Sequence, residues 1–143
     1  MKLLRITLLL AISGFSLSAC DTFQPSQLCG GETEADHQAF TNTFSEMQLV
    51  NQAITGEGEN GGQTGRVFEQ PVSLIIDLTS LEEVEMRLCI FEAKRNGEIV
   101  FDEDFSISAG QESFDLGDFG EGSHIIRVYV DGKLVENISF LIQ

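Results

Sequence analysis

From residue 67 to the C-terminus, apolar residues recur at every second position in short runs, and turn-forming residues separate the runs. In the run over 84–91, apolar side chains alternate with Glu85, Arg87 and Cys89. A period of two places one set on the buried face of a β-strand and the other set on the opposite face. This pattern predicts an all-β domain.

Residues that favour turns separate the predicted strands. Asn96-Gly97 and Asp131-Gly132 are typical of two-residue hairpin turns, whose central residues need positive φ. Short strands at this spacing are typical of an antiparallel β-sandwich. The strands predicted from these runs cover 72–78, 84–91, 98–101 with a continuation to 107, 113–116, 124–130 and 134–142.

Residues 37–54 fit two alternatives. Their apolar residues have helical spacing, at positions Phe40, Phe44, Met47, Val50 and Ile54. Against a helix, the run over 41–43 (Thr-Asn-Thr) propagates helices poorly. Met47 also alternates with polar neighbours as in a strand, so we favour a strand over 44–50 and leave the helix open.

With this strand, the chain has about seven, the number found in immunoglobulin-like sandwiches. The segment over 96–142, which includes the run GEGSHIIRVYVDGKLVENISFLI, resembles small bacterial immunoglobulin-like or fibronectin-like modules. The resemblance implies a fold, an immunoglobulin-like antiparallel β-sandwich over 39–143. It implies little about function, because such sandwiches serve many functions.

The N-terminus has the layout of a secretion signal. Lys2 and Arg5 precede an apolar run over 6–15, which is shorter than the roughly 20 residues that a membrane-spanning helix needs. The motif Leu17-Ser18-Ala19-Cys20 resembles the lipobox of bacterial lipoproteins. That resemblance implies a signal peptide over 1–19 and cleavage before Cys20, which would carry diacylglycerol and a further acyl chain such as palmitate. An ordinary secretory signal and a buried helix are the alternatives.

Asp21 bears on the choice of membrane. Directly after a lipidated cysteine, aspartate resembles the signal of enteric bacteria that retains a lipoprotein in the inner membrane, facing the periplasm. Without that rule, the outer membrane is the expected location. Residues 20–38 contain Pro25, Gly30 and Gly31 and little apolar content, so we expect the lipidated Cys20 and a flexible tether there.

The charge of the chain excludes several partners. Cleavage before Cys20 would leave 6 basic residues (8 minus Lys2 and Arg5) against 23 acidic ones, a formal charge of −17. Such a chain repels nucleic acid and anionic lipid surfaces, so we expect no nucleic-acid partner and a domain that stands off the membrane. A basic protein partner is electrostatically favoured, although solubility alone explains an acidic surface.

The two remaining cysteines suggest a disulfide. If Cys20 carries lipid, Cys29 and Cys89 form an even pair in an exported protein, where disulfides persist. A bridge would close a loop of about 60 residues and stabilise the fold by roughly 4 kcal/mol. Alternatively, Cys89 is a small buried core residue.

Two motifs that could hold a ligand fit that role poorly. Residues 56–61 match G-x-G-x-x-G, but Glu57 and Glu59 would repel phosphate, so we interpret 56–65 as a hairpin loop. The acidic groups lack the spacing of a calcium loop; they are Asp102-Glu103-Asp104 and the set Asp115, Asp118 and Glu121. Asp102 and Asp104 share one strand face and Glu103 lies on the other, so the three cannot converge on one ion.

The two histidines give no catalytic arrangement. Ser123 and His124 are adjacent and therefore lie on opposite faces of a strand. His37 and His124 also lack the companion ligands that zinc needs. We therefore expect no catalytic residue, no metal, no cofactor and no small-molecule substrate, and we do not predict an enzyme.

These inferences together predict a membrane-anchored lipoprotein of the bacterial cell envelope. Its sandwich would bind a protein of an envelope complex through an exposed sheet edge or hairpin loops. One alternative is an inhibitor that presents the loop over 56–65 to an envelope hydrolase. Another is a structural spacer without a binding site.

Overall fold

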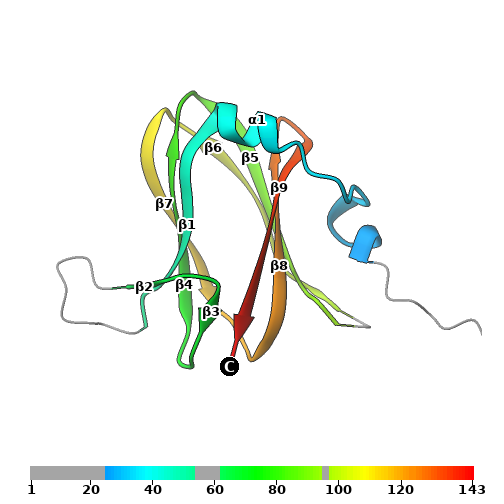
Figure 1. Ribbon diagram of the computed structural model, residues 1–143, viewed down its shortest axis with the longest axis vertical. Coiled ribbons are helices and arrows are strands. Elements are labelled where there is room, and N and C mark those ends of the chain that lie inside the picture. The colour runs from blue at the N-terminus through cyan, green and yellow to red at the C-terminus, as the bar shows by residue number, and fades with distance from the viewer. Residues whose placement is uncertain (1–24, 54–61, 95–96) are drawn as a thin grey trace, which may run out of the picture.

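The computed structural model describes residues 25–53, 62–94 and 97–143 (Figure 1). Its strands are β1 (Phe44–Asn51), β2 (Gln63–Thr64), β3 (Val67–Phe68), β4 (Ser73–Ser80), β5 (Val84–Glu92), β6 (Ile99–Ile107), β7 (Gly110–Asp118), β8 (Gly122–Val130) and β9 (Lys133–Ile142). They form a four-stranded sheet in the order β2-β1-β4-β7 and a five-stranded sheet in the order β3-β9-β8-β5-β6. The predicted all-β sandwich of two packed sheets is confirmed.

The long strands lie where the sequence predicts them. Within the described residues, seven strands have eight residues or more, and two short ones, β2 and β3, were not predicted. β7 is longer than the predicted 113–116, because Gln111 and Glu112 pair with Thr79 and Leu78 of β4. Neighbouring long strands within each sheet pair antiparallel, whereas β3 pairs parallel with β9.

The segment that the sequence left open between helix and strand contains both: residues 37–43 form a helix and residues 44–51 form a strand. Helix α1 (His37–Thr43) begins after Asp36, whose Oδ1 accepts a hydrogen bond from the backbone N–H of Ala39 at 3.0 Å. The chain then becomes extended at Phe44, where β1 starts. The strand predicted over 44–50 is confirmed, and the poor helix formers of 41–43 end the helix after two turns.

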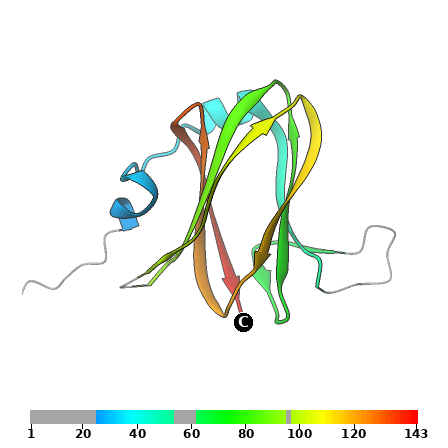
Figure 2. The same ribbon diagram turned by 180° about the vertical axis from the view of Figure 1, so that it is seen from behind.

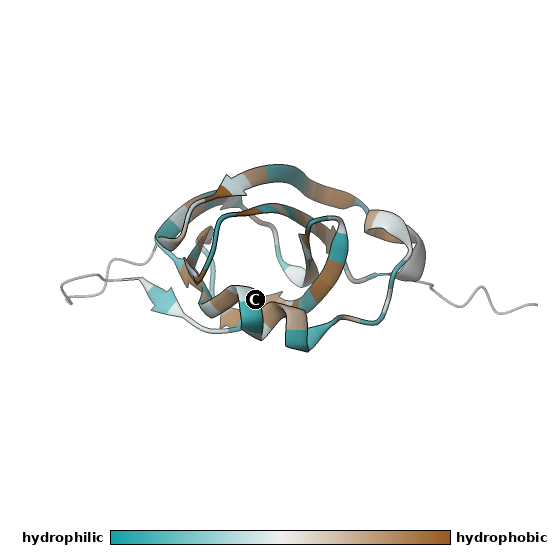
Figure 3. Cartoon of the chain, turned by 90° about the horizontal axis from the view of Figure 1, so that it is seen from above, coloured by the Kyte–Doolittle hydropathy of each residue, from teal (hydrophilic) through white to brown (hydrophobic). Residues whose placement is uncertain are grey.

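The core lies between the two sheets. Alternate side chains of β4 and β5 are at most 1% exposed; they are Leu74, Ile76, Leu78, Met86, Leu88 and Ile90. Burying each such side chain stabilises the fold by about 1.5–3 kcal/mol. Figure 3 shows the sheets end-on, with hydrophobic and hydrophilic residues alternating along the strands around the interior.

A second buried cluster covers the outer face of the five-stranded sheet. It consists of Cys29, Cys89, Phe91, Tyr129 and Leu134. A disulfide joins Cys29 to Cys89, with 5.8 Å between their Cα atoms. Cys29 lies in the 3-10 helix η1 (Pro25–Gly30), so the chain before α1 crosses this sheet face instead of leaving it open.

Hydrogen bonds also hold this N-terminal segment. The Tyr129 hydroxyl donates to the backbone carbonyl of Cys29, and Arg127 Nη1 donates to that of Leu28 at 2.6 Å. Backbone N–H of Asp36 donates to the carbonyl of Leu134 at 3.0 Å. Part of the stretch predicted as a flexible tether, from residue 28 to 36, is therefore attached to the sandwich.

Candidate functional site

The two sides of the sandwich differ in how their strand edges are covered. At β9, the backbone N–H of Leu134 donates to Glu32 Oε2 at 3.1 Å, and β3 pairs with Leu141 and Ile142. At the other side, β6 and β7 are the last strands of their sheets, and no described strand pairs with their outer edges. β6 ends and β7 begins at one turn, from which the two strands diverge into different sheets (Figures 1 and 2).

β6 exposes apolar side chains at this edge. Ile99 is 44% exposed and Val100 is 45% exposed, and among the described large apolar residues only Val67 and Leu81 are comparable. Nature usually protects an edge strand, because its unpaired backbone groups can pair with another chain. A nine-residue strand with exposed apolar residues is therefore a candidate docking edge.

Half-buried aromatic side chains continue this apolar surface. The rings of Phe101 and Phe105 stack with their centroids 6.4 Å apart, and Phe105 contacts Phe114 of β7 at 4.7 Å. All three pack against the main core. The core side of β6 thus presents aromatic surface next to the free edge.

Pairing with β5 fixes the direction of the acidic residues on β6. Asp102 lies opposite Cys89 and Asp104 opposite Arg87, on the outer face of the sheet. Glu103 lies opposite the buried Leu88 and therefore on the core side. The predicted alternation of these three carboxylates is confirmed.

One of these carboxylates has a basic partner. Arg87 donates from Nε and Nη2 to the two carboxylate oxygens of Asp102, each at 2.7 Å. This pairing lowers the pKa of Asp102 and raises the pKa of Arg87. Glu103 and Asp104 form no ion pair with any described residue.

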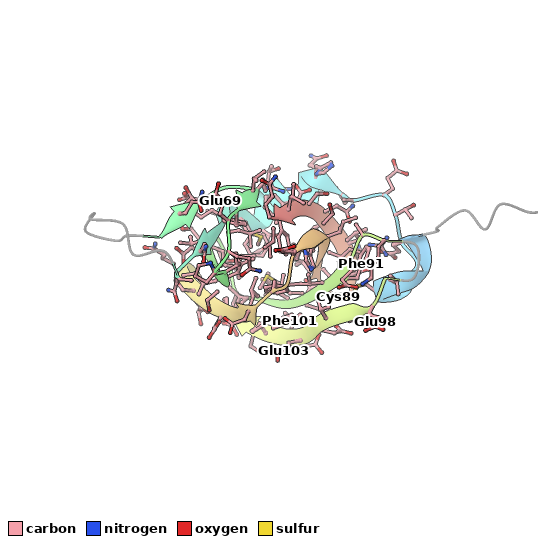
Figure 4. All side chains as sticks on the ribbon, turned by 90° about the horizontal axis from the view of Figure 1, so that it is seen from below. Glu69, Cys89, Phe91, Glu98, Phe101 and Glu103 are labelled. Carbon is pink, nitrogen blue, oxygen red and sulfur yellow. A yellow bond between two sulfur atoms is a disulfide. The ribbon has the colours of Figure 1, made fainter. Side chains whose placement is uncertain are left out.

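The acidic charge of this side is balanced only in part, by Arg87 at Asp102. Residues 96–126 contain eight acidic residues and no Lys or Arg. This stretch forms β6, β7 and the first part of β8. Figure 4 shows Glu98, Phe101 and Glu103 along this side of the molecule and Glu69 on the opposite side.

The other predicted site residues do not form a second site. Cys20, Asp21 and the G-x-G-x-x-G run at 56–61 lie outside the described residues. Where the chain is described, no group of three side chains could hold a metal ion. Asp115 Oδ1 accepts a hydrogen bond from its near neighbour Gly117 N at 2.8 Å, and His37 Nδ1 lies 3.1 Å from Glu136 Oε2.

His124 is a core residue. It is 3% exposed, stacks on Phe140 at 5.0 Å between ring centroids, and meets the edge of Phe119 at 5.6 Å. Burial lowers its pKa, so the ring is favoured in the neutral form. Its Nδ1 lies 3.1 Å from the carbonyl oxygen of Gly122, which leaves the imidazole in a packing role.

Hollows lie on both sheets, including one of about 280 Å³ beside Arg66, Ser123 and His124. Another of about 310 Å³ lies beside the disulfide, between Glu32, Arg87, Asp104 and Tyr129. A wider one of about 830 Å³ lies on the four-stranded sheet and is lined mainly by polar side chains. On that face Ser113 donates to Asp77 Oδ1 at 2.6 Å.

Comparisons with known proteins give no family. No family model and no curated protein matches the chain. The crystal structure of β-D-glucoside glucohydrolase from Trichoderma reesei is similar at 12% identity with a TM-score of 0.34, over 70% of this chain and 18% of that chain. This chain spans less than a fifth of that enzyme, and a likeness this low carries no argument about activity. No helix in the described part of the chain is long and apolar enough to cross a bilayer.

Proposed function

We propose that this protein is a lipid-anchored lipoprotein of the bacterial envelope whose sandwich binds another protein at the free edge of β6. The observation that carries the proposal is the exposure of Ile99 and Val100 on a strand whose outer edge has no described partner. In strand addition, main-chain hydrogen bonds supply affinity and alternate side chains supply specificity.

The lipobox at 17–20 supports the anchor, and the disulfide supports export. Cys20 is the expected lipid carrier and Asp21 the expected inner-membrane signal. The bridge between Cys29 and Cys89 fits an oxidising compartment, where disulfides persist. Envelope location, an acidic body and a free edge together favour a binding subunit.

The free edge of β6 also favours a binding subunit over the two alternatives, a spacer and an inhibitor. A spacer needs no exposed apolar strand, which is a liability for an isolated domain. An inhibitor would act through the loop over 56–65, which lies mostly outside the described residues. The last strand, β9, is a poorer docking edge than β6 because residues 32–36 and β3 already occupy parts of it.

The anchor is tested with the full-length chain in a bacterial host. We expect the wild-type protein in the membrane fraction, with a mass that corresponds to cleavage before residue 20 and added acyl chains. Cys20→Ser should abolish both the acyl mass and the membrane association. A wild-type protein that washes freely from envelopes with an unmodified Cys20 would refute the anchor.

The docking edge is tested by site-specific photocrosslinking in the native envelope. A crosslinker at Val100 should give one discrete adduct, and the same crosslinker at Glu69, on the opposite side of the domain, should not (Figure 4). Deletion of residues 56–61 should leave the adduct intact. Equal adducts from both positions, or loss of the adduct with the loop, would contradict docking at β6.

A further inference from the structure

The two faces of β6 offer different chemistry to a strand placed beside it. Successive residues of an added strand point alternately to the two sheet faces. On the outer face, residues of the added strand would lie next to Asp102 and Asp104. Asp102 forms an ion pair with Arg87, and Asp104 forms none with a described residue. On the core side, residues of the added strand would lie next to Phe101, Glu103 and Phe105.

The acidic residues favour a basic neighbour. An opposite-charge pair across two strands strengthens association by about 1.5- to 5-fold, and like charges weaken it comparably. Asp104 is exposed on the outer face of the strand, so a Lys or Arg on that face of the added strand can meet it. No Lys or Arg lies within 96–126, and Arg87 of β5, which lies opposite Asp104, donates its hydrogen bonds to Asp102.

The aromatic residues favour apolar neighbours on the core side. Phe101 and Phe105 are half-buried, and Phe105 continues to Phe114 of β7. An added strand that places apolar side chains against this row would extend the core of the sandwich. Apolar residues at every second position of the partner satisfy this requirement.

The same residues disfavour a second copy of this chain. Two copies of β6 paired about a two-fold axis near Glu103 would set Asp102, Glu103 and Asp104 of one chain against those of the other. Like charges directly opposite are destabilising, and charged residues on an edge strand are a known means of preventing such pairing. The occupant is therefore a different protein.

We propose that the segment bound at β6 is an extended basic strand, in which Lys or Arg residues alternate with apolar residues. This inference rests on the proposed function and names the chemistry of the partner. Three features on the single strand β6 together support it. They are the exposed apolar residues Ile99 and Val100, the acidic residues 102–104, and the half-buried rings of Phe101 and Phe105.

The test uses the full-length protein purified in detergent and three capped nine-residue peptides. The first alternates Lys and Val, the second has the same composition with Lys and Val in separate blocks, and the third alternates Glu and Val. Affinity is measured by fluorescence anisotropy, and the contact region by hydrogen exchange with mass spectrometry. We expect only the alternating basic peptide to bind and to slow exchange in residues 98–107.

A pair of matched variants locates the charge effect. Asp104→Lys and Glu69→Lys change the net charge equally, and both residues are exposed. Asp104→Lys should weaken binding of the alternating basic peptide by about 2- to 25-fold, because it replaces an attraction by a repulsion. Glu69→Lys should leave the affinity almost unchanged at the same salt concentration.

Four results would overturn the inference. Equal binding of the blocked peptide would show attraction by net charge alone, and protection of residues 110–118 in place of 98–107 would put the contact on β7. A dimer of the full chain with β6 protected would make the occupant a second copy. If no peptide binds while Val100 still crosslinks to an envelope protein, the inference fails and the proposed function stands.

Discussion

Removing the disulfide tests how the N-terminal segment stabilises the sandwich. The double variant Cys29→Ala/Cys89→Ala opens a link between residues that are 60 positions apart. In the chain-entropy model, a loop of this size stabilises the folded state by about 4.3 kcal/mol at 25 °C. Both cysteines are buried, so losing their sulfur atoms adds roughly 1 kcal/mol in packing. The expected loss of about 4–6 kcal/mol is a large share of the 5–15 kcal/mol typical of a domain.

The assay is urea unfolding followed by two probes. Tyr129 is the only tyrosine of a chain without tryptophan, and its hydroxyl contacts Cys29, so its fluorescence reports on the N-terminal segment. Far-ultraviolet circular dichroism reports on the sheets. Without the link the unfolded chain exposes more surface, so the slope of stability against urea should increase.

The single variant Cys29→Ala is the control. It should lose the same loop-closure contribution as the double variant but less packing, because the Cys89 side chain remains. A loss below about 2 kcal/mol in the double variant, with an unchanged urea slope, would refute the reasoning from loop closure. A fluorescence change that precedes the dichroism change would show that the segment detaches before the sheets unfold.

Three further predictions concern the sandwich itself. Because burial lowers the pKa of His124 from 6.5, the unfolded state binds the proton more readily, and the free energy of unfolding should fall as pH drops below that value. His124→Phe should reduce this loss, and urea midpoints between pH 8 and pH 5 measure it. Asp102→Asn should lower the free energy of unfolding by less than about 1 kcal/mol, since the Arg87 and Asp102 side chains are 37% and 35% exposed. Adding 1 M salt should reduce the difference in stability between the wild type and this variant. Leu88→Ala should cost about 2–5 kcal/mol in the same assay, because Leu88 is 0% exposed, and a cost below about 1 kcal/mol would contradict its place in the core.

The strands were predictable because their signals are local. The alternation over 84–88 in β5 needs no knowledge of its neighbours, and the burial pattern follows it there. At the turn between β8 and β9, Asp131 and Gly132 have φ of 50° and 78°, as the Asp-Gly pair predicts. Helix α1 was ambiguous because the four-residue spacing of Phe40 and Phe44 fits both the helical period and the strand period of two. Only the structure shows that the helix ends before Phe44, where β1 begins.

The second cluster and the free edge were not predictable in the same way. Both depend on which strands pair, a property of residues far apart in sequence. A partial signal existed in Leu88-Cys89-Ile90-Phe91, an unbroken apolar run, because a strand buried on both faces loses its alternation. A similar signal is the run Ile99-Val100-Phe101, which is apolar at every position although β6 lies at an edge.

The disulfide also decides where mechanical load enters the domain. If lipid holds Cys20 in a membrane, Cys29 follows it by nine positions, and such a stretch reaches at most about 30 Å. Tension on the anchor then passes through the sulfur atoms to Cys89, in a strand that is flanked by β6 and β8. α1 and β1 lie outside this path, so pulling on the anchor would not peel them from the body.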